Sequence, residues 1–174
     1  TTDAGGVAER LAAALRPFVR GDLPVRLRAW DGSEAGPVGA PLVELRSRDA
    51  IRRLLWHPGV AVVGSRNPSA GGRDNARHFA NDLARSGLSV ISGLAAGVDR
   101  AAHEAALEAS GLTVAVLGTG PDVPYPKTHA SLLARIAAHG AVVSEHPPGT
   151  EALREHFPSR NRIIAGLALG TLVV

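Results

Sequence analysis

The stretch Val60-Ala61-Val62-Val63-Gly64-Ser65-Arg66 joins a continuous apolar run to a short polar turn. A strand that is exposed on one face alternates apolar and polar residues, so an unbroken apolar run of this length is typical of a strand buried on both faces. The glycine after the strand lets the backbone approach a ligand closely. We therefore predict a strand of a parallel sheet, with a binding site at its carboxyl end.

The same pattern recurs along the rest of the chain at intervals of about 27 residues. The further apolar runs are Leu88–Ile91, Thr113–Leu117, Ala141–Val143 and Thr171–Val174. Helical stretches lie between the runs, at Gly72–Arg85, Arg100–Ala109, Ser131–Ala138 and Ile163–Leu169. Because strands and helices alternate, right-handed crossovers should connect parallel strands. We predict that residues 60–174 form a Rossmann-like α/β domain with helices on both faces of a parallel sheet.

Residues 1–59 have a different pattern, which predicts a small α-β-β-α module. Its expected elements are a helix with one apolar face from Val7 to Phe18, a half-exposed strand at Val25–Ala29, a glycine-rich loop at Asp31–Ala40, a strand at Pro41–Leu45 and a helix at Asp49–Trp56. Pro58 and Gly59 stop the last helix. We place the domain boundary at His57–Gly59.

Composition excludes several classes of protein. The chain has 174 residues, of which 45% are hydrophobic and 20% charged, which is globular usage. No apolar run approaches the roughly 18 residues of a membrane span, so we expect a cytoplasmic protein. The absence of cysteine excludes disulfides and thiolate metal sites. The net charge of +3 is too small to predict nucleic-acid binding without further evidence.

Glycine-rich polar segments follow the predicted strands where their carboxyl ends should meet. These segments are 64–69, 92–99, 118–127 and 144–150, and residues 157–162 open the last helix. Backbone N–H groups and helix N-termini at this edge favour anions. Since Arg66, Lys127 and Arg160 add positive charge, we predict a phosphate-binding surface. One such turn would merely link a strand to a helix, but four converging turns favour a site.

Motifs of nucleotide cofactors and catalytic nucleophiles do not fit this chain. No G-x-x-x-x-G-K-[ST] sequence is present, and no G-x-G-x-x-G follows the first strand. Neither Ser92 nor Ser144 lies in a G-x-S-x-G elbow. No spacing resembles a zinc set. We therefore expect no cofactor and no enzyme activity.

Titratable residues near this edge have structural interpretations. Asp99 lies where a helix begins, so we expect it to cap that helix. His103, one turn later, is expected to be a structural histidine, and Glu145 to orient an arginine such as Arg160. We expect His129, together with His139 and His156, at the surface.

Several of these segments resemble the family of the DNA-processing protein DprA, also called Smf. The resemblance covers residues 60–174 and rests on 60–66, 92–99 with His103 and Leu107, Tyr125-Pro126-Lys127, Ser144-Glu145, and 157–165. It implies a non-enzymatic Rossmann-fold protein that binds single-stranded DNA and loads RecA during natural transformation. The residues we expect to contact DNA or phosphate are Gly64, Ser65, Arg66, Ser92, Gly93, Gly97, Lys127 and Arg160.

Aromatic side chains, which stack on bases in single-strand binding, are scarce after residue 60. Of Phe79, Tyr125 and Phe157, we expect Tyr125 alone at the site, and hence weak stacking. Thr128 and His129 follow Lys127 where the family commonly has asparagine. This departure puts base contacts in question, but not phosphate contacts.

Residues 1–59 resemble instead the N-terminal region of actinobacterial cyclopropane-fatty-acyl-phospholipid synthases. The matching stretches are Leu23–Pro37 and Arg52–Gly59. That family transfers a methylene group from S-adenosylmethionine to lipid acyl chains, through a methyltransferase domain that this chain lacks. We interpret the chain as a chimera, and as a fragment because it ends inside an apolar run.

Two alternatives to DNA binding remain at this point. One is a Rossmann-like nucleotide phosphoribohydrolase with Glu145 as its base, although the P-G-G-x-G-T motif of those enzymes is absent. The other is a non-catalytic fragment of a cyclopropane synthase. By resemblance, relatives use later segments to dimerise and to meet RecA. We therefore expect DNA binding weaker than in a full-length relative, and leave RecA loading open.

Overall fold

Five parallel strands form the part of the sheet that positions the candidate site. The computed structural model describes residues 26–29, 34–35, 42–45 and 57–174. The parallel strands are β4 (Gly59–Val63), β5 (Ser89–Ser92), β6 (Thr113–Leu117), β7 (Ala141–Ser144) and β8 (Thr171–Val173). Their order across the sheet is β7-β6-β5-β4-β8. Strands β4 to β7 are largely buried on both faces, which confirms the interpretation of four of the apolar runs. The fifth run, Thr171–Val174, was expected to be buried in the same way, but β8 is largely exposed, because no described strand pairs with its outer side.

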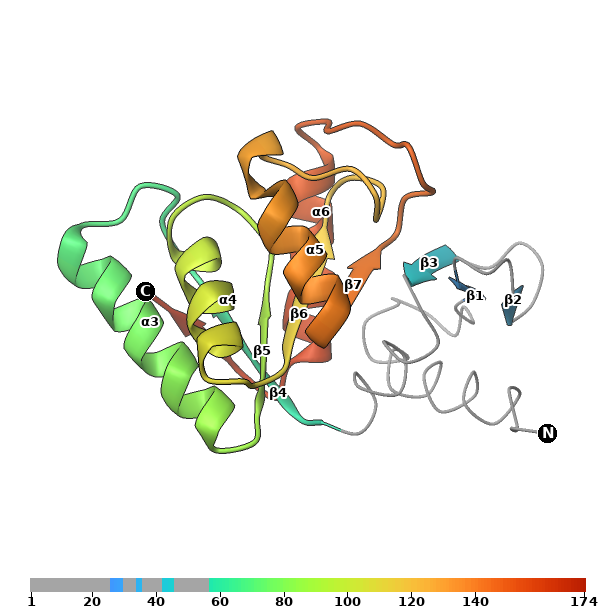
Figure 1. Ribbon diagram of the computed structural model, residues 1–174. Coiled ribbons are helices and arrows are strands. Elements are labelled where there is room, and N and C mark those ends of the chain that lie inside the picture. The colour runs from blue at the N-terminus through green and yellow to red at the C-terminus, as the bar shows by residue number, and fades with distance from the viewer. Residues whose placement is uncertain (1–25, 30–33, 36–41, 46–56) are drawn as a thin grey trace.

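Helices cover both faces of this sheet. They are α3 (Ala70–Arg85), α4 (Val98–Glu108), α5 (Ala130–His139) and α6 (His156–Leu167), with a short 3-10 helix, η2, at Lys127–His129. Figure 1 shows α3, α4 and α5 in front of the sheet and α6 behind it. The predicted Rossmann-like α/β architecture is confirmed for this part of the chain.

Small side chains allow α3 and α4 to pack closely on the sheet. Ala76, Ala80 and Ala84 recur at intervals of one helical turn along α3, and all three are buried. They share one core cluster with buried alanines of α4 and with Val62 and Val90 of the sheet. A stripe of alanines therefore fixes the position of α4, whose N-terminus lies at the site.

Helix α6 begins seven residues before the predicted Ile163–Leu169 segment. Pro158 and the polar residues around it were interpreted as the opening of the helix, yet His156 already has helical hydrogen bonding. Proline is tolerated in the first turn, because the N–H that it lacks would have no partner within the helix. As a result, the first two turns of α6 face the carboxyl edge of the sheet.

Strand β4 lies at the point where the chain reverses its direction across the sheet. From β4 the chain proceeds through α3 to β5 on one side, whereas β8, reached through α6 on the opposite face, pairs with the other side of β4. Because α3 and α6 lie on opposite faces, the loop after β4 and the first turns of α6 border a crevice at the carboxyl end of β4. Open α/β sheets bind their ligands in such a crevice.

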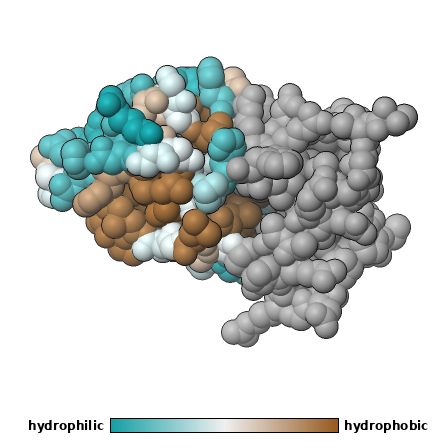
Figure 2. Space-filling view, turned by 90° about the horizontal axis from the view of Figure 1, so that it is seen from below, coloured by the Kyte–Doolittle hydropathy of each residue, from teal (hydrophilic) through white to brown (hydrophobic). Residues whose placement is uncertain are grey.

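The opposite, amino-terminal end of the strands has a different surface. Figure 2 views the molecule from this side and shows apolar surface (brown) beside hydrophilic surface (teal). Leu169, which precedes β8 here, is 78% exposed. In the described part of the chain, no helix combines the length and the apolarity that a membrane span requires.

Three shorter strands extend the sheet beyond β7. They are β1 (Arg26–Ala29), β2 (Glu34–Ala35) and β3 (Leu42–Leu45). Strands β1 and β3 match the two predicted strands, whereas β2 lies inside the segment predicted as a glycine-rich loop. Because β3 pairs antiparallel with β7, these strands belong to the same sheet as β4–β8. The helices predicted at 7–18 and 49–56 lie outside the described residues.

Candidate nucleic-acid interface

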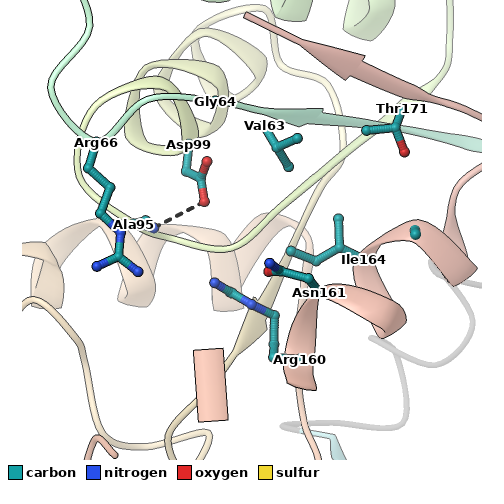
Figure 3. A pocket seen from close by; sticks show the side chains of 10 residues that line it. Val63, Gly64, Arg66, Ala95, Asp99, Arg160, Asn161, Ile164 and Thr171 are labelled. Atoms are coloured by element: carbon teal, nitrogen blue, oxygen red, sulfur yellow. Dashed lines mark hydrogen bonds between the residues drawn. The ribbon is translucent and has the colours of Figure 1, made fainter. Parts of the chain in front are cut away.

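A cavity of about 300 Å³ lies in the crevice beside the end of β4. Gly64 and Arg66 from the loop after β4 line it, together with Asp99 of α4 and Arg160 and Asn161 of α6. Figure 3 shows the side chains of Arg66, Asp99 and Arg160 converging on it from these separate elements. The cavity thus brings together Gly64, Arg66 and Arg160, three of the residues predicted to contact phosphate.

The loop after β4 is held in place by the start of α4. The backbone N–H of Val98 donates to the carbonyl oxygen of Ser65 at 3.1 Å, and the backbone N–H of Asn67 donates to Ser65 Oγ at 3.1 Å. Gly97 has φ +80°, and a Cβ there would lie 2.3 Å from the Ser65 oxygen. Only glycine allows this approach, so Gly97 supports the loop that presents Arg66.

Two predicted contact residues at the end of β5 lie beneath this surface. Ser92 is fully buried, and its hydroxyl donates to the carbonyl oxygen of Val62 at 2.7 Å. The backbone N–H of Gly93 donates to Asp99 Oδ2 at 3.1 Å. The hydroxyl of Ser92 and the N–H of Gly93 are therefore committed to protein partners, and both residues support the site from below.

Asp99 anchors the loop after β5 and does not cap α4, which corrects the expectation from the sequence. The N-cap of α4 is Gly97, and Asp99 Oδ2 instead accepts from the backbone N–H groups of Gly93 and of Ala95, the latter at 3.3 Å (Figure 3). Burial raises the pKa of Asp99, while the charge of Arg160 and these two hydrogen bonds lower it. The carboxylate therefore fixes the backbone between β5 and α4.

Arg160 is a buried cation in the cavity wall. Arg160 is only 4% exposed. Its Nη1 donates to the carbonyl oxygen of Gly93, at 2.7 Å, and to that of Val116. Burial lowers the pKa of Arg160 to about 10, so the guanidinium remains charged at neutral pH. The predicted phosphate contact therefore competes with hydrogen bonds that Arg160 already makes to the sheet.

Glu145 pairs with a different arginine from the one expected. It accepts a hydrogen bond from Arg162 on the exposed side of α6, whereas Arg160 lies beside Asp99. His129, expected at the surface, is 4% exposed, and its Nδ1 lies 3.0 Å from the carbonyl oxygen of Leu94. Both corrections come from contacts between segments that lie far apart in the sequence.

His103 is buried, as expected for a structural histidine. Its Nδ1 lies 2.6 Å from Thr113 Oγ1, and the hydroxyl of Thr113 donates to the carbonyl oxygen of Val90. Nε2 has no hydrogen-bond partner. Burial, together with the charge of Arg160 and the nearby His129, lowers the pKa of His103 to about 3. The imidazole is therefore neutral at physiological pH and supplies no charge to the site.

Aromatic side chains contribute more to this edge than the sequence suggested. The rings of Tyr125 and Phe157 have centroids 5.1 Å apart, and Cζ of Arg66 lies 5.5 Å from the Phe157 centroid. Phe157 therefore joins Tyr125 at the site. The sequence does contain a signal for it, since Phe157, Arg160, Asn161 and Ile164 recur at helical spacing and the last three line the cavity.

Lys127 does not line the cavity. Lys127 is exposed and begins η2, two residues after Tyr125. The ring of Tyr125 contacts the ring of Phe157, and the guanidinium of Arg66 lies over that same Phe157 ring. The Tyr125–Phe157 pair therefore connects the Lys127 segment with the loop that carries Arg66. Arg66 and Lys127 are both exposed and follow different strands, β4 and β6.

Comparison with known proteins places the chain in a family. The sequence profile described as DNA recombination-mediator protein A matches residues 51–174. The chain belongs to this family. Protein Smf of Synechocystis is 42% identical over 83% of this chain and 36% of the relative, and the putative DNA processing protein DprA of Mycobacterium tuberculosis is 44% identical over 82% and 37%. The chain thus spans little more than a third of these relatives.

Solved structures of DprA proteins share the fold. The chain matches DprA of Streptococcus pneumoniae with a TM-score of 0.71 and 44% identity, over 77% of this chain and 46% of that one. It matches DNA processing protein A of Helicobacter pylori, a structure described for its single-stranded DNA binding mode, with a TM-score of 0.65 and 28% identity, over 70% and 55%. Both comparisons support the Rossmann-like DprA domain.

The similarity to DprA begins before residue 60, the start predicted from the sequence. The family profile starts at residue 51, and the alignment with the Mycobacterium protein, over 144 residues, is longer than the segment 60–174. Part of the first 59 residues therefore resembles DprA. The resemblance of this region to cyclopropane-fatty-acyl-phospholipid synthases receives no support from these matches.

Proposed function

We propose that this DprA-family chain binds single-stranded DNA at the carboxyl edge of its parallel sheet. The observation that carries the proposal is the association of two exposed cations with one aromatic pair: Arg66 lies over Phe157, and Lys127 follows Tyr125 by two residues. A cationic groove with aromatic surface is the general architecture of single-strand binding.

In this proposal the buried groups hold the edge in shape, and the exposed ones contact the strand. Gly64, Ser65, Arg66 and Lys127 face the DNA phosphates, whereas Ser92, Gly93 and Gly97 fix the loops beneath them. Arg160 adds positive potential to the cavity wall. In this proposal the protein is a non-enzymatic, cytoplasmic recombination mediator, and RecA loading is expected of its full-length relatives.

The alternative hypothesis, a nucleotide phosphoribohydrolase, has no comparable support. Glu145, the base that a phosphoribohydrolase mechanism requires, is engaged by the guanidinium of Arg162. This ion pair supports the expectation that Glu145 orients an arginine and does not act as a base. We therefore expect Glu145→Gln to leave DNA binding unchanged.

The test is binding of a fluorescent single-stranded oligonucleotide, followed by anisotropy at several salt concentrations. Each phosphate contact contributes about −0.7 to the slope of log K against log salt for single strands. Lys127→Ala should weaken binding and reduce the magnitude of this slope by about that amount. Arg66→Ala should do the same.

A matched control removes the same charge at the opposite end of the sheet. Arg85 is exposed and is the last residue of α3, far from the carboxyl edge, so Arg85→Ala should bind DNA almost as the unmodified chain does. If Lys127→Ala and Arg85→Ala behaved alike, the site would be misplaced. A folded protein without any single-strand binding at low salt would overturn the proposed function.

A further inference from the structure

The Tyr125–Phe157 pair is exposed in a way that packing alone does not require. Tyr125 is 46% exposed, among the most exposed large hydrophobic side chains in the described part of the chain. Its ring is inclined by 37° to that of Phe157, at a centroid distance of 5.1 Å. One side of the tyrosine ring is therefore supported by another aromatic ring while much of its surface meets solvent.

Phe157 is held firmly enough to support such a surface. Its ring packs against the end of β6, since a Cβ on Gly118 would lie only 3.1 Å from Phe157 Cδ1. The guanidinium of Arg66 lies over the same ring, within the distance of a cation–π contact. Three segments from the ends of β4 and β6 and the start of α6 thus meet in one cluster.

We propose that the exposed ring of Tyr125, supported by Phe157, is a stacking platform for one DNA base. The inference rests on the proposed binding of single-stranded DNA and adds a base subsite to the phosphate contacts. Arg66, over Phe157, and Lys127, two residues after Tyr125, are placed to contact the phosphates on either side of the stacked base. Because every base has a π face, the subsite selects for the presence of a base and not for its identity.

The test compares two oligonucleotides of equal length and charge, one of thymidines and one abasic. The unmodified chain should bind the thymidine strand about tenfold more tightly, which corresponds to the lower part of the range for one stacked base. Tyr125→Leu removes the ring, so it should bind both strands equally and keep the salt dependence of the unmodified chain. Tyr125→Phe should retain the preference.

A second readout reports stacking directly. A 2-aminopurine base in the oligonucleotide should lose fluorescence when the unmodified chain or Tyr125→Phe binds it, and should lose much less with Tyr125→Leu. The matched control is Phe79→Leu, because Phe79 is also exposed, at 43%, but lies on α3. It should behave as the unmodified chain does.

The outcomes separate this inference from the proposed function. Equal binding of thymidine and abasic strands by the unmodified chain, or a preference that survives in Tyr125→Leu, would overturn the base subsite and leave phosphate binding intact. If a folded protein bound neither strand, the proposed function would fail, and the base subsite with it. Loss of the preference in Phe79→Leu would likewise contradict the assignment to Tyr125.

Discussion

Arg160 Nη1 donates a hydrogen bond to the carbonyl oxygen of Gly93 at 2.7 Å, across 67 residues of sequence. The bond joins the second turn of α6, on one face of the sheet, to the loop between β5 and α4, which belongs to the other face. Asp99 holds the same loop through the N–H of Gly93. One peptide segment is therefore fixed from both sides by an oppositely charged, buried pair.

Replacing Arg160 should be costly for stability. Arg160→Leu leaves the buried Asp99 carboxylate without its cation and deprives two backbone carbonyls of a donor. Leaving a buried hydrogen-bonding group without its partner costs about 1–3 kcal/mol. We expect the free energy of unfolding, measured by urea denaturation, to fall by about this amount.

The neighbouring Arg162 is a suitable control. Its side chain is 48% exposed and pairs with Glu145 at the surface. Surface ion pairs contribute at most about 1 kcal/mol, so Arg162→Leu should change the free energy of unfolding little. Equal losses in Arg160→Leu and Arg162→Leu would contradict the structural role assigned to Arg160.

The hydrogen bonds around His103 define its tautomer. The hydroxyl proton of Thr113 is directed to the carbonyl oxygen of Val90, so Thr113 Oγ1 can only accept from His103. Nδ1 therefore carries the proton and Nε2 does not. Protonating the buried Nε2 would create a charge with no acceptor, which agrees with a pKa lowered to about 3.

This shift in pKa predicts how stability depends on pH. The pKa of His103 is about 3 in the folded protein, against 6.5 for an ordinary histidine. The contribution of His103 is complete above pH 6.5 and decreases as the pH falls toward 3, because the unfolded chain then binds a proton that the folded chain does not. The slope approaches about 1.4 kcal/mol per pH unit.

The measurement is urea denaturation between pH 4 and pH 7, on the unmodified chain and on His103→Asn. Asparagine keeps a donor toward Thr113 but does not titrate, so the slope due to His103 should vanish. Asp99 acts in the opposite direction, since its raised pKa makes the folded chain take up a proton first. It is present in both proteins, so their difference isolates His103. Parallel curves would contradict the assignment.

The strands could be predicted from the sequence because a strand buried on both faces is a continuous run of apolar residues. Runs such as Thr113–Leu117 are continuous in apolar residues, and this run coincides with β6. The regular helical pattern predicts a helix at Ile163–Leu169, with residues 157–162 only as its opening, whereas α6 is already helical from His156. Local patterns thus predicted the sheet better than they predicted the helix that completes the site.

The roles of individual polar residues could not be obtained from local patterns. Asp99 has the position of a helix cap, but its partners are Gly93 and Ala95 in the preceding loop. Arg160 looks like a phosphate ligand in sequence, and its depth depends on how α6 packs under the sheet. The partners of Asp99 and the burial of Arg160 depend on contacts between segments that are distant in the sequence, and local patterns do not predict these contacts.

Comparing alanine substitutions at Gly97 and Gly87 distinguishes the effect of backbone strain from the effect of moving the loop at the binding site. Gly97 and Gly87 both have φ +80°, where an L-residue is strained, and ψ −122° places Gly97 outside the left-handed α region that L-residues can visit. A Cβ at Gly87 meets nothing within 4 Å, whereas one at Gly97 would lie 2.3 Å from Ser65 O and 2.7 Å from the carbonyl group of Arg66. Alanine at Gly97 must therefore move the loop that presents Arg66.

We expect Gly87→Ala and Gly97→Ala both to lower the free energy of unfolding, and Gly97→Ala alone to weaken DNA binding. The binding measurement is anisotropy with a single-stranded oligonucleotide at a temperature where circular dichroism shows both variants folded. Gly97→Ala should also reduce the salt dependence, because Arg66 is displaced from its phosphate contact. Equal affinities for the two variants would mean that the loop after β4 does not contribute to binding.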